Sequence, residues 1–526
     1  MPTAGPCRPS RPEGDESMSR IGLFLAAFGL GILGGCNGAS RNDPGNIDPA
    51  PPPPTNTVSG AVLFKGAPLA GATVTAWLTN DNTIVGTVTT DATGAYSFSG
   101  LSAEGNVNGV YQFWARKTGY GFYPSVGSGG EAMRFDHNDA QFQLNGQTDV
   151  PIVFTVIQFT SVPDSSLTGA NFLAYDGSNP FVTLPGTGQT ISYASGDDGS
   201  LKAGVAWPGT RLIANGDGTV TDNLTGLIWL KNAGCFNPAL WTPALTEVNQ
   251  LASGACGLTD GSKAGDWRMP NLNELESMVD VSQSNPALPA GNPFTGFSNA
   301  IYWSSTSYYG GETGSPYAWV IRMSDGRYMN DYVSNVKATS NNAVWAVKGL
   351  GGGTIKLQAT GMYVVYNPGD DGSVQAGVPP TYPRWVDKGN GTIVDTVTGL
   401  TWLKKADCID ADWADAVSAV NSLASGQCGL TDGSTAGSWR MPNRNELQSL
   451  SDRMQTNHSD FFNDTIMNVD GTVYEPAIFT NFVVSQYYWT STTDAADTSE
   501  AWTVFSCDFG VYDTPKSSVG YTLAVR

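Results

Sequence analysis

The stretch Asn215-Gly-Asp-Gly-Thr-Val-Thr-Asp-Asn-Leu-Thr-Gly-Leu-Ile-Trp-Leu-Lys231 recurs in the carboxyl-terminal third of the chain as Lys388-Gly-Asn-Gly-Thr-Ile-Val-Asp-Thr-Val-Thr-Gly-Leu-Thr-Trp-Leu-Lys404. Gly and Asn tolerate the positive φ that tight hairpin turns require. The apolar residues Val220 and Leu224 follow the turn. The stretch therefore predicts a β-hairpin that is present twice, in two copies of one fold.

Further matches extend this duplication in both directions, always in the same order. They pair Gly196–Val205 with Gly369–Val378, Trp267–Leu275 with Trp439–Leu447, Tyr302–Thr306 with Tyr488–Thr492, Ala318-Trp319 with Ala501-Trp502, and Ala346–Lys348 with Ala524–Arg526. A period this long indicates tandem domains rather than a solenoid. We expect a first repeat over 187–349 and a second repeat over 360–526.

Each repeat carries signals for two short helices. Apolar residues have helical spacing from Leu245 to Leu251, after Pro243, and from Trp413 to Leu423. Asn271 with Glu274 forms a capping-box pattern that starts a second helix. Asn443 and Glu446 repeat the pattern, and alternating segments surround Trp303, Trp319, Trp489 and Trp502. The prediction is an α+β domain with a curled antiparallel sheet.

The amino terminus has the layout of an export signal. A cation, Arg20, precedes an apolar run from Ile21 to Gly35 that is too short to span a bilayer comfortably. Leu33-Gly34-Gly35-Cys36 resembles the lipobox of bacterial lipoproteins, which implies acylation of Cys36 and, because Asn37 follows rather than Asp, the outer membrane or cell surface. An ordinary signal peptide with an incidental Cys is the alternative. Residues 1–36 are thus expected to be upstream sequence and signal peptide, and the Pro-rich residues 37–56 a tether.

Residues 57–157 alternate apolar and polar side chains over short runs, with Gly and Asp/Asn turns between them. This pattern predicts an antiparallel β-sandwich. Val58–Val62, Pro68–Val74 and Thr90–Phe98 resemble the carboxypeptidase regulatory-like domain, a transthyretin-like sandwich that usually serves as a spacer. Residues 158–186 are expected to connect it to the first repeat. His137, between Asp136 and Asp139, is expected in a solvated loop.

The composition excludes several functional classes. The chain has 526 residues, 27 Lys and Arg, 47 Asp and Glu, and a formal net charge of −20. Because phosphate binding needs clustered cations, this charge argues against a nucleic-acid partner. The chain contains only 2 His, so a His-rich metal centre is also excluded.

The order Gly-Asp-Gly-Thr-Val-x-Asp-x-x-Thr-Gly-Leu-x-Trp, then Trp-Arg-Met-Pro-Asn-x-x-Glu-Leu, then Tyr-Trp-(Ser/Thr)-Ser-Thr resembles the Lcl C-terminal domain family. The resemblance covers both repeats. It implies a relationship to C-type-lectin-like and formylglycine-generating-enzyme-like folds, and a role in surface adhesion that includes binding of sulfated polysaccharides. The second repeat holds about nine Lys and Arg against twenty Asp and Glu, so repulsion would oppose an anionic ligand. Neutral glycans or proteins fit this charge better.

Two cysteine pairs stand at equivalent places in the repeats. Cys235 with Cys256, and Cys408 with Cys428, are predicted to form one disulfide per repeat, because the protein is exported. Metal binding is the alternative, but two Cys without His are a poor zinc set. Cys507 has no counterpart in the first repeat, and a buried thiol is the simplest expectation for it.

Shared catalytic groups are not evident, so we expect no enzyme. The repeats share no His, which removes a Ser-His or Cys-His couple common to both. Chemistry related to formylglycine-generating enzyme would need reactive cysteines, and Cys507 alone is available for it. Arg268 with Glu274 is shared, but a helix cap explains the pair more simply. No cofactor is expected; calcium is an open alternative, with Asp217 and Asp222 as weak candidate ligands.

The predicted binding surface lies where the two repeats differ most. Aromatic and Asn- or Arg-rich loops on a rigid scaffold make adaptable contact surfaces. The candidate ligand-binding residues are Tyr308, Tyr309, Tyr317, Arg327, Tyr328, Asp508 and Tyr512. The function predicted is non-catalytic binding or adhesion by a cell-surface lipoprotein. A structural envelope protein and a ligand-binding protein diversified by a retroelement are the alternatives.

Overall fold

The computed structural model describes residues 55–78, 83–102, 110–126, 133–135, 155–158, 166–168, 170–178, 182–309, 315–329, 335–349, 351–379, 384–455, 457–463, 466–467, 473–475 and 477–526. The predicted signal peptide with Cys36, nearly all of the tether, and Asp136, His137 and Asp139 lie outside these residues. Within the described part of the chain, no helix combines the length and the apolar character needed to cross a membrane.

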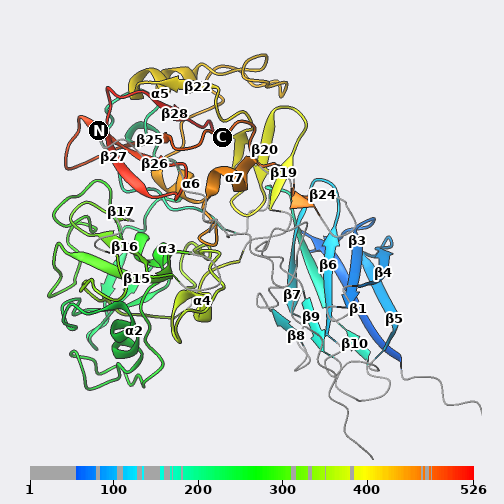
Figure 1. The fold of residues 1–526 in the computed structure, drawn as a ribbon, viewed down its shortest axis with the longest axis horizontal. Helices are drawn as coiled ribbons and strands as arrows, with labels where there is room; N and C mark the ends of the chain where they lie inside the picture. The colour runs from blue at the N-terminus through cyan, green and yellow to red at the C-terminus, as the bar shows by residue number, and fades with distance from the viewer. Residues whose placement is uncertain are drawn as a thin grey trace, which may run out of the picture.

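The amino-terminal part consists of two β-sheets, drawn in blue and cyan in Figure 1. The first sheet contains β1 (Thr55–Phe64), β2 (Ala67–Pro68), β5 (Ala95–Ser102), β7 (Gly121–Val126), β10 (Ser166–Thr168) and β11 (Ala170–Tyr175). The second sheet contains β3 (Thr73–Leu78), β4 (Thr83–Thr89), β6 (Val110–Arg116), β8 (Met133–Phe135) and β9 (Thr155–Gln158). Val62 of β1, Val74 of β3 and Phe113 of β6 are buried in one shared core.

The first sheet continues beyond the predicted end of this domain. β10 and β11 fall in the segment 158–186 that we expected to be a connection. β11 pairs with β1 in parallel and with β7 in antiparallel orientation. The residues up to Tyr175 therefore belong to the amino-terminal β domain, and the connection is shorter than predicted.

Beyond residue 204, the described part of the first repeat contains two small sheets and two helices. One sheet is β12 (Leu212–Ala214), β13 (Thr219–Asp222), β14 (Ile228–Leu230) and β18 (Val347–Lys348); the other is β15 (Ile301–Ser307), β16 (Ala318–Arg322) and β17 (Arg327–Met329). The helices are α2 (Trp241–Asn249) and α3 (Leu272–Glu276). The hairpin between β12 and β13 turns at Gly216 and Gly218, both at positive φ, which confirms the predicted turn.

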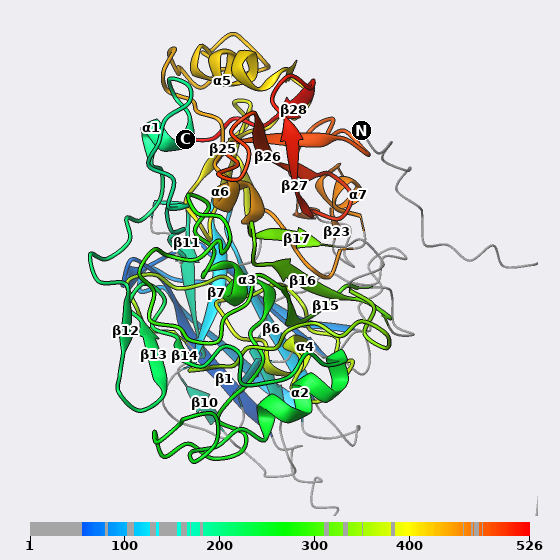
Figure 2. The same cartoon turned by 90° about the vertical axis from the view of Figure 1, so that its left-hand side faces the viewer.

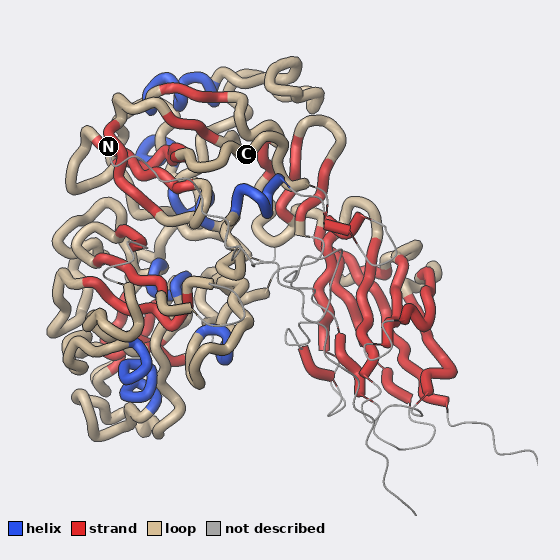
Figure 3. The backbone as a smooth tube through the Cα atoms, viewed as in Figure 1, coloured by secondary structure: helices blue, strands red, loops and turns tan. Residues whose placement is uncertain are grey.

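The second repeat has the same plan with additional elements. Its sheets are β19 (Trp385–Asp387), β20 (Thr392–Asp395) and β21 (Thr401–Leu403); then β22 (Ile409–Ala411), β25 (Tyr487–Thr493), β26 (Glu500–Phe505), β27 (Val511–Pro515) and β28 (Gly520–Thr522); then β23 (Ile466–Met467) with β24 (Val473–Glu475). Its helices are α5 (Trp413–Asn421), α6 (Arg444–Gln448) and α7 (His458–Asn463). Figure 3 shows how short these elements are relative to the loops.

One apolar core runs through both repeats. It joins Trp229, Trp303 and Trp319 of the first repeat to Trp402 and Trp502 of the second. Each of these indoles is at most 2% exposed. Burial of such rings is the largest apolar contribution that a single side chain makes to folding. The two repeats are thus packed against each other through a shared apolar core and are not independent domains joined only by a linker.

A short segment near the start of each repeat crosses to the other repeat. The first docking segment, residues 193–203, includes α1 (Asp198–Leu201), which packs on β25 of the second repeat. The second docking segment, residues 366–376, includes α4 (Asp371–Val374), which packs on β15 of the first repeat. Figure 2 shows α1 at the edge of the second repeat, beside the carboxyl terminus, and α4 near β15 and α2 of the first repeat. The exchange is reciprocal.

The multidomain, mostly β-strand fold with few helices is confirmed. The helices α2, α3, α5 and α6 occupy the predicted places, and both capping boxes, Asn271 with Glu274 and Asn443 with Glu446, are formed. Helix α2 begins at Trp241, two residues before Pro243. The crossing of the docking segments was not predicted.

Candidate functional site

The divergent loops that we predicted to bind ligand lie largely at the junction between the repeats. Strand β17 lies beside β27, and Arg327 pairs with Asp513 across the junction. Tyr328 is 1% exposed, and the guanidinium of Arg444 lies 5.3 Å from its ring centre. Arg327 and Tyr328 therefore hold the repeats together, and Tyr328 does not lie on an exposed loop surface.

The other predicted ligand-binding residues are distributed over both repeats. Tyr309 is 5% exposed and packs with Met362, Tyr363 and Met454 of the second repeat, which corrects its expected exposure. Tyr308 is half-buried against Trp319, and Tyr317 is half-buried. Asp508 and Tyr512 are also half-buried, and the Tyr512 hydroxyl donates to Asp508 at 3.5 Å. The structure does not gather these seven residues into one exposed surface.

The two calcium candidates have structural partners. Asp222 forms a two-pronged ion pair with Arg211, with both N···O distances 3.1 Å, and also accepts hydrogen bonds from the Leu224 N–H and the Thr225 hydroxyl. The Oδ1 of Asp217 accepts from the N–H and hydroxyl of Thr219 inside the hairpin turn. Asp222 is already neutralised by Arg211, so its carboxylate contributes to folding.

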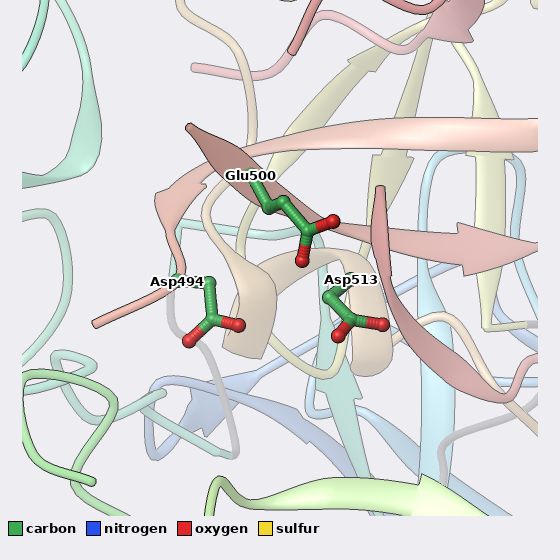
Figure 4. A group of neighbouring side chains, drawn as sticks. All are labelled: Asp494, Glu500 and Asp513. Carbon is green, nitrogen blue, oxygen red and sulfur yellow. The ribbon is translucent and has the colours of Figure 1, made fainter. Parts of the chain in front are cut away.

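One group of three carboxylates lies close together among the described residues. Asp494, Glu500 and Asp513 come from the end of β25, from β26 and from β27, and their nearest oxygens all lie within 4.8 Å of one another (Figure 4). Arg327 of the first repeat pairs with Asp513. Burial raises the pKa of Asp494, and Arg444 and Arg327 oppose this rise. The cation that faces this group in the structure is thus a guanidinium from the other repeat.

The two predicted disulfides are present. Cys235 is bonded to Cys256 with a Cα–Cα distance of 5.6 Å, and Cys408 to Cys428 with 5.7 Å. Both distances are typical of disulfides.

Cys507, the other cysteine among the described residues, is buried beside His458. The His458 Nδ1 lies 3.3 Å from the Cys507 carbonyl oxygen, and Nε2 accepts from the Asp452 N–H at 3.2 Å. Burial is the main reason that the pKa of His458 falls to about 3. Both ring nitrogens thus face main-chain groups, and the imidazole is neutral at physiological pH.

The Trp-Arg-Met-Pro-Asn motif forms a rigid corner at the junction. In the first repeat, Arg268 forms two 2.5 Å bonds to Glu274, and Glu274 in turn accepts from the Asn271 N–H. This network leaves the Asn271 side-chain amide free to donate outward, and it donates to the Ala376 carbonyl in the second docking segment at 2.9 Å. Asn443 donates to the Ala203 carbonyl of the first docking segment in the same way.

A buried carboxylate anchors each docking segment. Asp371 Oδ2 accepts from the hydroxyls of Thr360 at 2.6 Å and of Thr306, in the first repeat, at 2.7 Å. Asp198 is bound in the same way by Thr187 and by Thr492 of the second repeat. The two residues of each shared Asp-Asp pair thus have different roles. The first residue, Asp197 or Asp370, caps the helix α1 or α4, and the second, Asp198 or Asp371, bonds to threonine hydroxyls.

The anchoring carboxylates predict a pH dependence of stability. Burial raises the pKa of Asp371 to about 7 and of Asp198 to about 6, and Glu274 with Asp370, and Glu446 with Asp197, add repulsion. Since these values exceed the usual Asp pKa of 3.8, the stabilisation is full at acidic pH and is lost as pH rises through 6 and 7. We expect urea midpoints to fall between pH 5 and pH 8.

Replacing Asp371 with Asn should flatten this dependence, because an amide does not ionise. The exposed Asp497→Asn variant serves as the control and should keep the wild-type slope. Equal slopes for Asp371→Asn and wild type would contradict the assignment.

A pocket opens at the junction where the two repeats face each other. Its volume is about 80 Å³, and its lining includes pairs of equivalent residues from the two copies. These pairs are Asn273 with Asn445, Glu276 with Gln448, Ser277 with Ser449, Val279 with Ser451, Leu184 with Leu357, and Pro185 with Gln358; Gly186, Trp207 and Tyr328 complete the lining. The lining is mainly apolar with several polar groups, and a cavity of this size has room for several waters or the tip of a larger ligand.

Most polar groups of this junction pocket already have partners. Asn273 donates to the Gln358 carbonyl at 2.8 Å, and Asn445 to the Pro185 carbonyl at 3.1 Å. The side-chain oxygen of Gln358 is different: it is buried and has no hydrogen-bond partner among the described residues. Such an acceptor is costly unless a donor reaches it.

The two sides of the junction pocket differ in charge. Glu276 takes a hydrogen bond from Arg444 at 3.2 Å, whereas its equivalent Gln448 accepts from Arg453 at 2.7 Å. Burial raises the pKa of Glu276, and Arg444 and Tyr328 oppose the rise. Arg444 and Arg453 stand where the first repeat has Leu272 and Val281.

The sequence analysis did not identify Glu276, Gln448, Arg444, Arg453 or Trp207 as residues in or around a pocket. The differences between the repeats were visible in the aligned Trp-Arg-Met-Pro-Asn motifs, but their meaning depends on the pairing of the repeats.

Comparison with known proteins adds one clear result. No curated protein matches the chain. The Lcl C-terminal domain family matches residues 218–348 and 391–526, which together make up more than half of the chain and begin after the docking segments. These two matches coincide with the two repeats whose motifs meet at the junction, and the chain therefore belongs to the Lcl C-terminal domain family.

Proposed function

We propose that this protein is a lipid-anchored surface protein that binds extracellular glycan or protein ligands without catalysis. Cys36 would carry the lipid, and residues 37–56 would hold the folded part away from the outer membrane. The two Lcl C-terminal domain repeats are compatible with a binding module at the cell surface. The proposal includes no cofactor and no nucleic-acid partner.

The junction pocket is the observation that carries this proposal. It combines an indole, four side-chain amides, three serines and a carboxylate, which are the groups that recognise the faces and hydroxyls of neutral sugars. The buried Gln358 oxygen would accept a hydrogen bond from a ligand hydroxyl. Because Arg444 already pairs with Glu276, the pocket offers no free carboxylate that would require a cationic ligand.

A glycan array and a pull-down with the full chain test the proposal, and Gln358→Met sharpens the test. This variant keeps side-chain length but removes the buried acceptor, so we expect about tenfold weaker binding, the loss of one good hydrogen bond. Its thermal stability should be unchanged or higher, because an unpaired buried polar atom is removed. A structural role would show the opposite pattern, with lower stability and no loss of binding.

Trp207→Ala is a second binding variant, and Val519→Ala, at a site that is 68% exposed, is the control. The absence of any ligand in both assays would instead favour a structural envelope protein.

A further inference from the structure

Three of the contacts that join the docking segments to their receiving surfaces occur in both directions. In the second repeat the receiving surface is Thr492, Asn443 and Lys516; in the first it is Thr306, Asn271 and Lys337. The ammonium of Lys516 lies 4.7 Å from the ring centre of Tyr193, and that of Lys337 lies 4.5 Å from that of Tyr366. Each docking segment is therefore bound by an equivalent threonine, asparagine and lysine of the other repeat.

Glycines allow close backbone approaches in both docking segments. A Cβ on Gly199 would lie 1.8 Å from the Ile191 carbonyl oxygen, and one on Gly372 would lie 2.0 Å from that of Val364. A Cβ on Gly196 would lie 1.9 Å from the side-chain nitrogen of Asn421, in the second repeat. Gly199 and Gly372 thus allow each segment to fold tightly on the residues just before it, and Gly196 allows the first segment to lie against the second repeat.

The covalent link between the repeats takes little part in their pairing. Residues up to Ile355 still bond to the first repeat, through the Leu224 carbonyl, whereas Leu357 already bonds to Val378 of the second. Lys356 alone separates these two attachments. Nothing in the receiving surfaces distinguishes a docking segment of the same chain from that of a neighbouring chain.

We propose that a second copy of this chain is a partner of the paired repeats: the first docking segment of one chain seats on the second repeat of another, with the first repeat following it. The exchange keeps the contacts between each docking segment and its receiving surface, which makes it a low-cost route to association. Within one chain the short link gives an effective concentration in the millimolar range. The local concentration of chains crowded on a membrane surface approaches the millimolar range, whereas the concentration of dilute chains does not.

Cysteine cross-linking on the full chain tests the exchange. The side-chain nitrogen of Asn421 lies 3.2 Å from the Ser195 carbonyl oxygen, so Ser195→Cys and Asn421→Cys place thiols on the two sides of the docked segment. One chain carries Ser195→Cys and a second, with a different tag, carries Asn421→Cys. They are mixed in lipid vesicles at rising density and treated with a short bismaleimide, and the chain without added cysteines gives the background.

We expect the yield of cross-linked heterodimer to increase with the density of the chains in the vesicles. The control is the mixture of Ser195→Cys with Ser253→Cys, because Ser253 lies in an exposed turn of the first repeat. The yield should exceed that of the control by at least about tenfold. Adding Gly196→Ala should abolish it. The double variant in one chain should cross-link internally. Internal cross-linking without heterodimer at the highest density would overturn the proposal, and so would a double variant that does not cross-link. Neither result depends on glycan binding, so this proposal and the proposed function fail separately.

Discussion

Replacing Arg384 with Met is expected to lower the free energy of unfolding by about 3–5 kcal/mol, because it leaves a buried carboxylate without its cation. Arg384 forms two bonds to Asp395, of 2.9 and 2.7 Å, and a third to the Ser449 carbonyl at 2.7 Å. Asp395 is fully buried, so water cannot replace the lost partner. The measurement is urea unfolding of the full chain followed by tryptophan fluorescence.

Two comparisons separate this effect from a general loss of charge. Lys404→Met breaks the partly exposed pair with Asp387 and should cost under about 1 kcal/mol. The double variant Arg384→Met with Asp395→Leu removes the orphaned carboxylate and should recover much of the loss. If the single Arg384 variant were no less stable than the Lys404 variant, the pair would not be the anchor that its burial implies.

Removing the second disulfide should be the other large effect. Changing Cys408 and Cys428 to Ser opens a loop with a sequence separation of 20 residues, which the chain-entropy estimate values at ~3 kcal/mol. The loss should be seen in the urea midpoint. It should be matched by the variant that changes Cys235 and Cys256, because the two bonds close loops of nearly the same length.

A reducing agent provides the internal check. It should destabilise the wild-type chain by the sum of both losses and should further weaken each Ser variant by only one. A Ser variant as stable as the wild type under oxidising conditions would mean that the bond is absent from the protein in solution.

The parts of the fold that depend on local signals could be predicted from the sequence. The helix that starts at Asn271 follows from a capping box whose partners are three residues apart, and the hairpin before Val220 follows from its Gly turns. The disulfides also followed from spacing repeated in two copies. These features are decided within a few neighbouring residues or by duplication, so tertiary context did not override them.

The features that were missed depend on which surfaces meet. Tyr328 looked like an exposed loop aromatic, because no local signal shows that the second repeat covers it. Asp222 looked like a calcium ligand, yet Arg211 is its partner across 11 residues. One signal was available: Arg384 stands at the equivalent distance before Asp395. A cation preserved in both copies, opposite a carboxylate preserved in both, indicates a buried pair.

The junction pocket could not be found in either repeat alone. Its walls are residues that are equivalent in the two copies, such as Asn273 and Asn445, and they become a pocket only when the repeats pair. The sequence showed that the copies exist, but pairing depends on contacts between residues more than 200 positions apart, such as Asn443 with Ala203.

The reciprocal crossing of the docking segments also determines whether the two repeats stay together after a protease cuts the chain between them. Lys356 is exposed, and it stands between the last attachment to one repeat and the first attachment to the other. Trypsin cutting there would sever the peptide but none of the bonds that hold Asp198 to Thr492 or Asp371 to Thr306. A denaturing gel would then show two fragments, while the undenatured protein would still sediment as one particle.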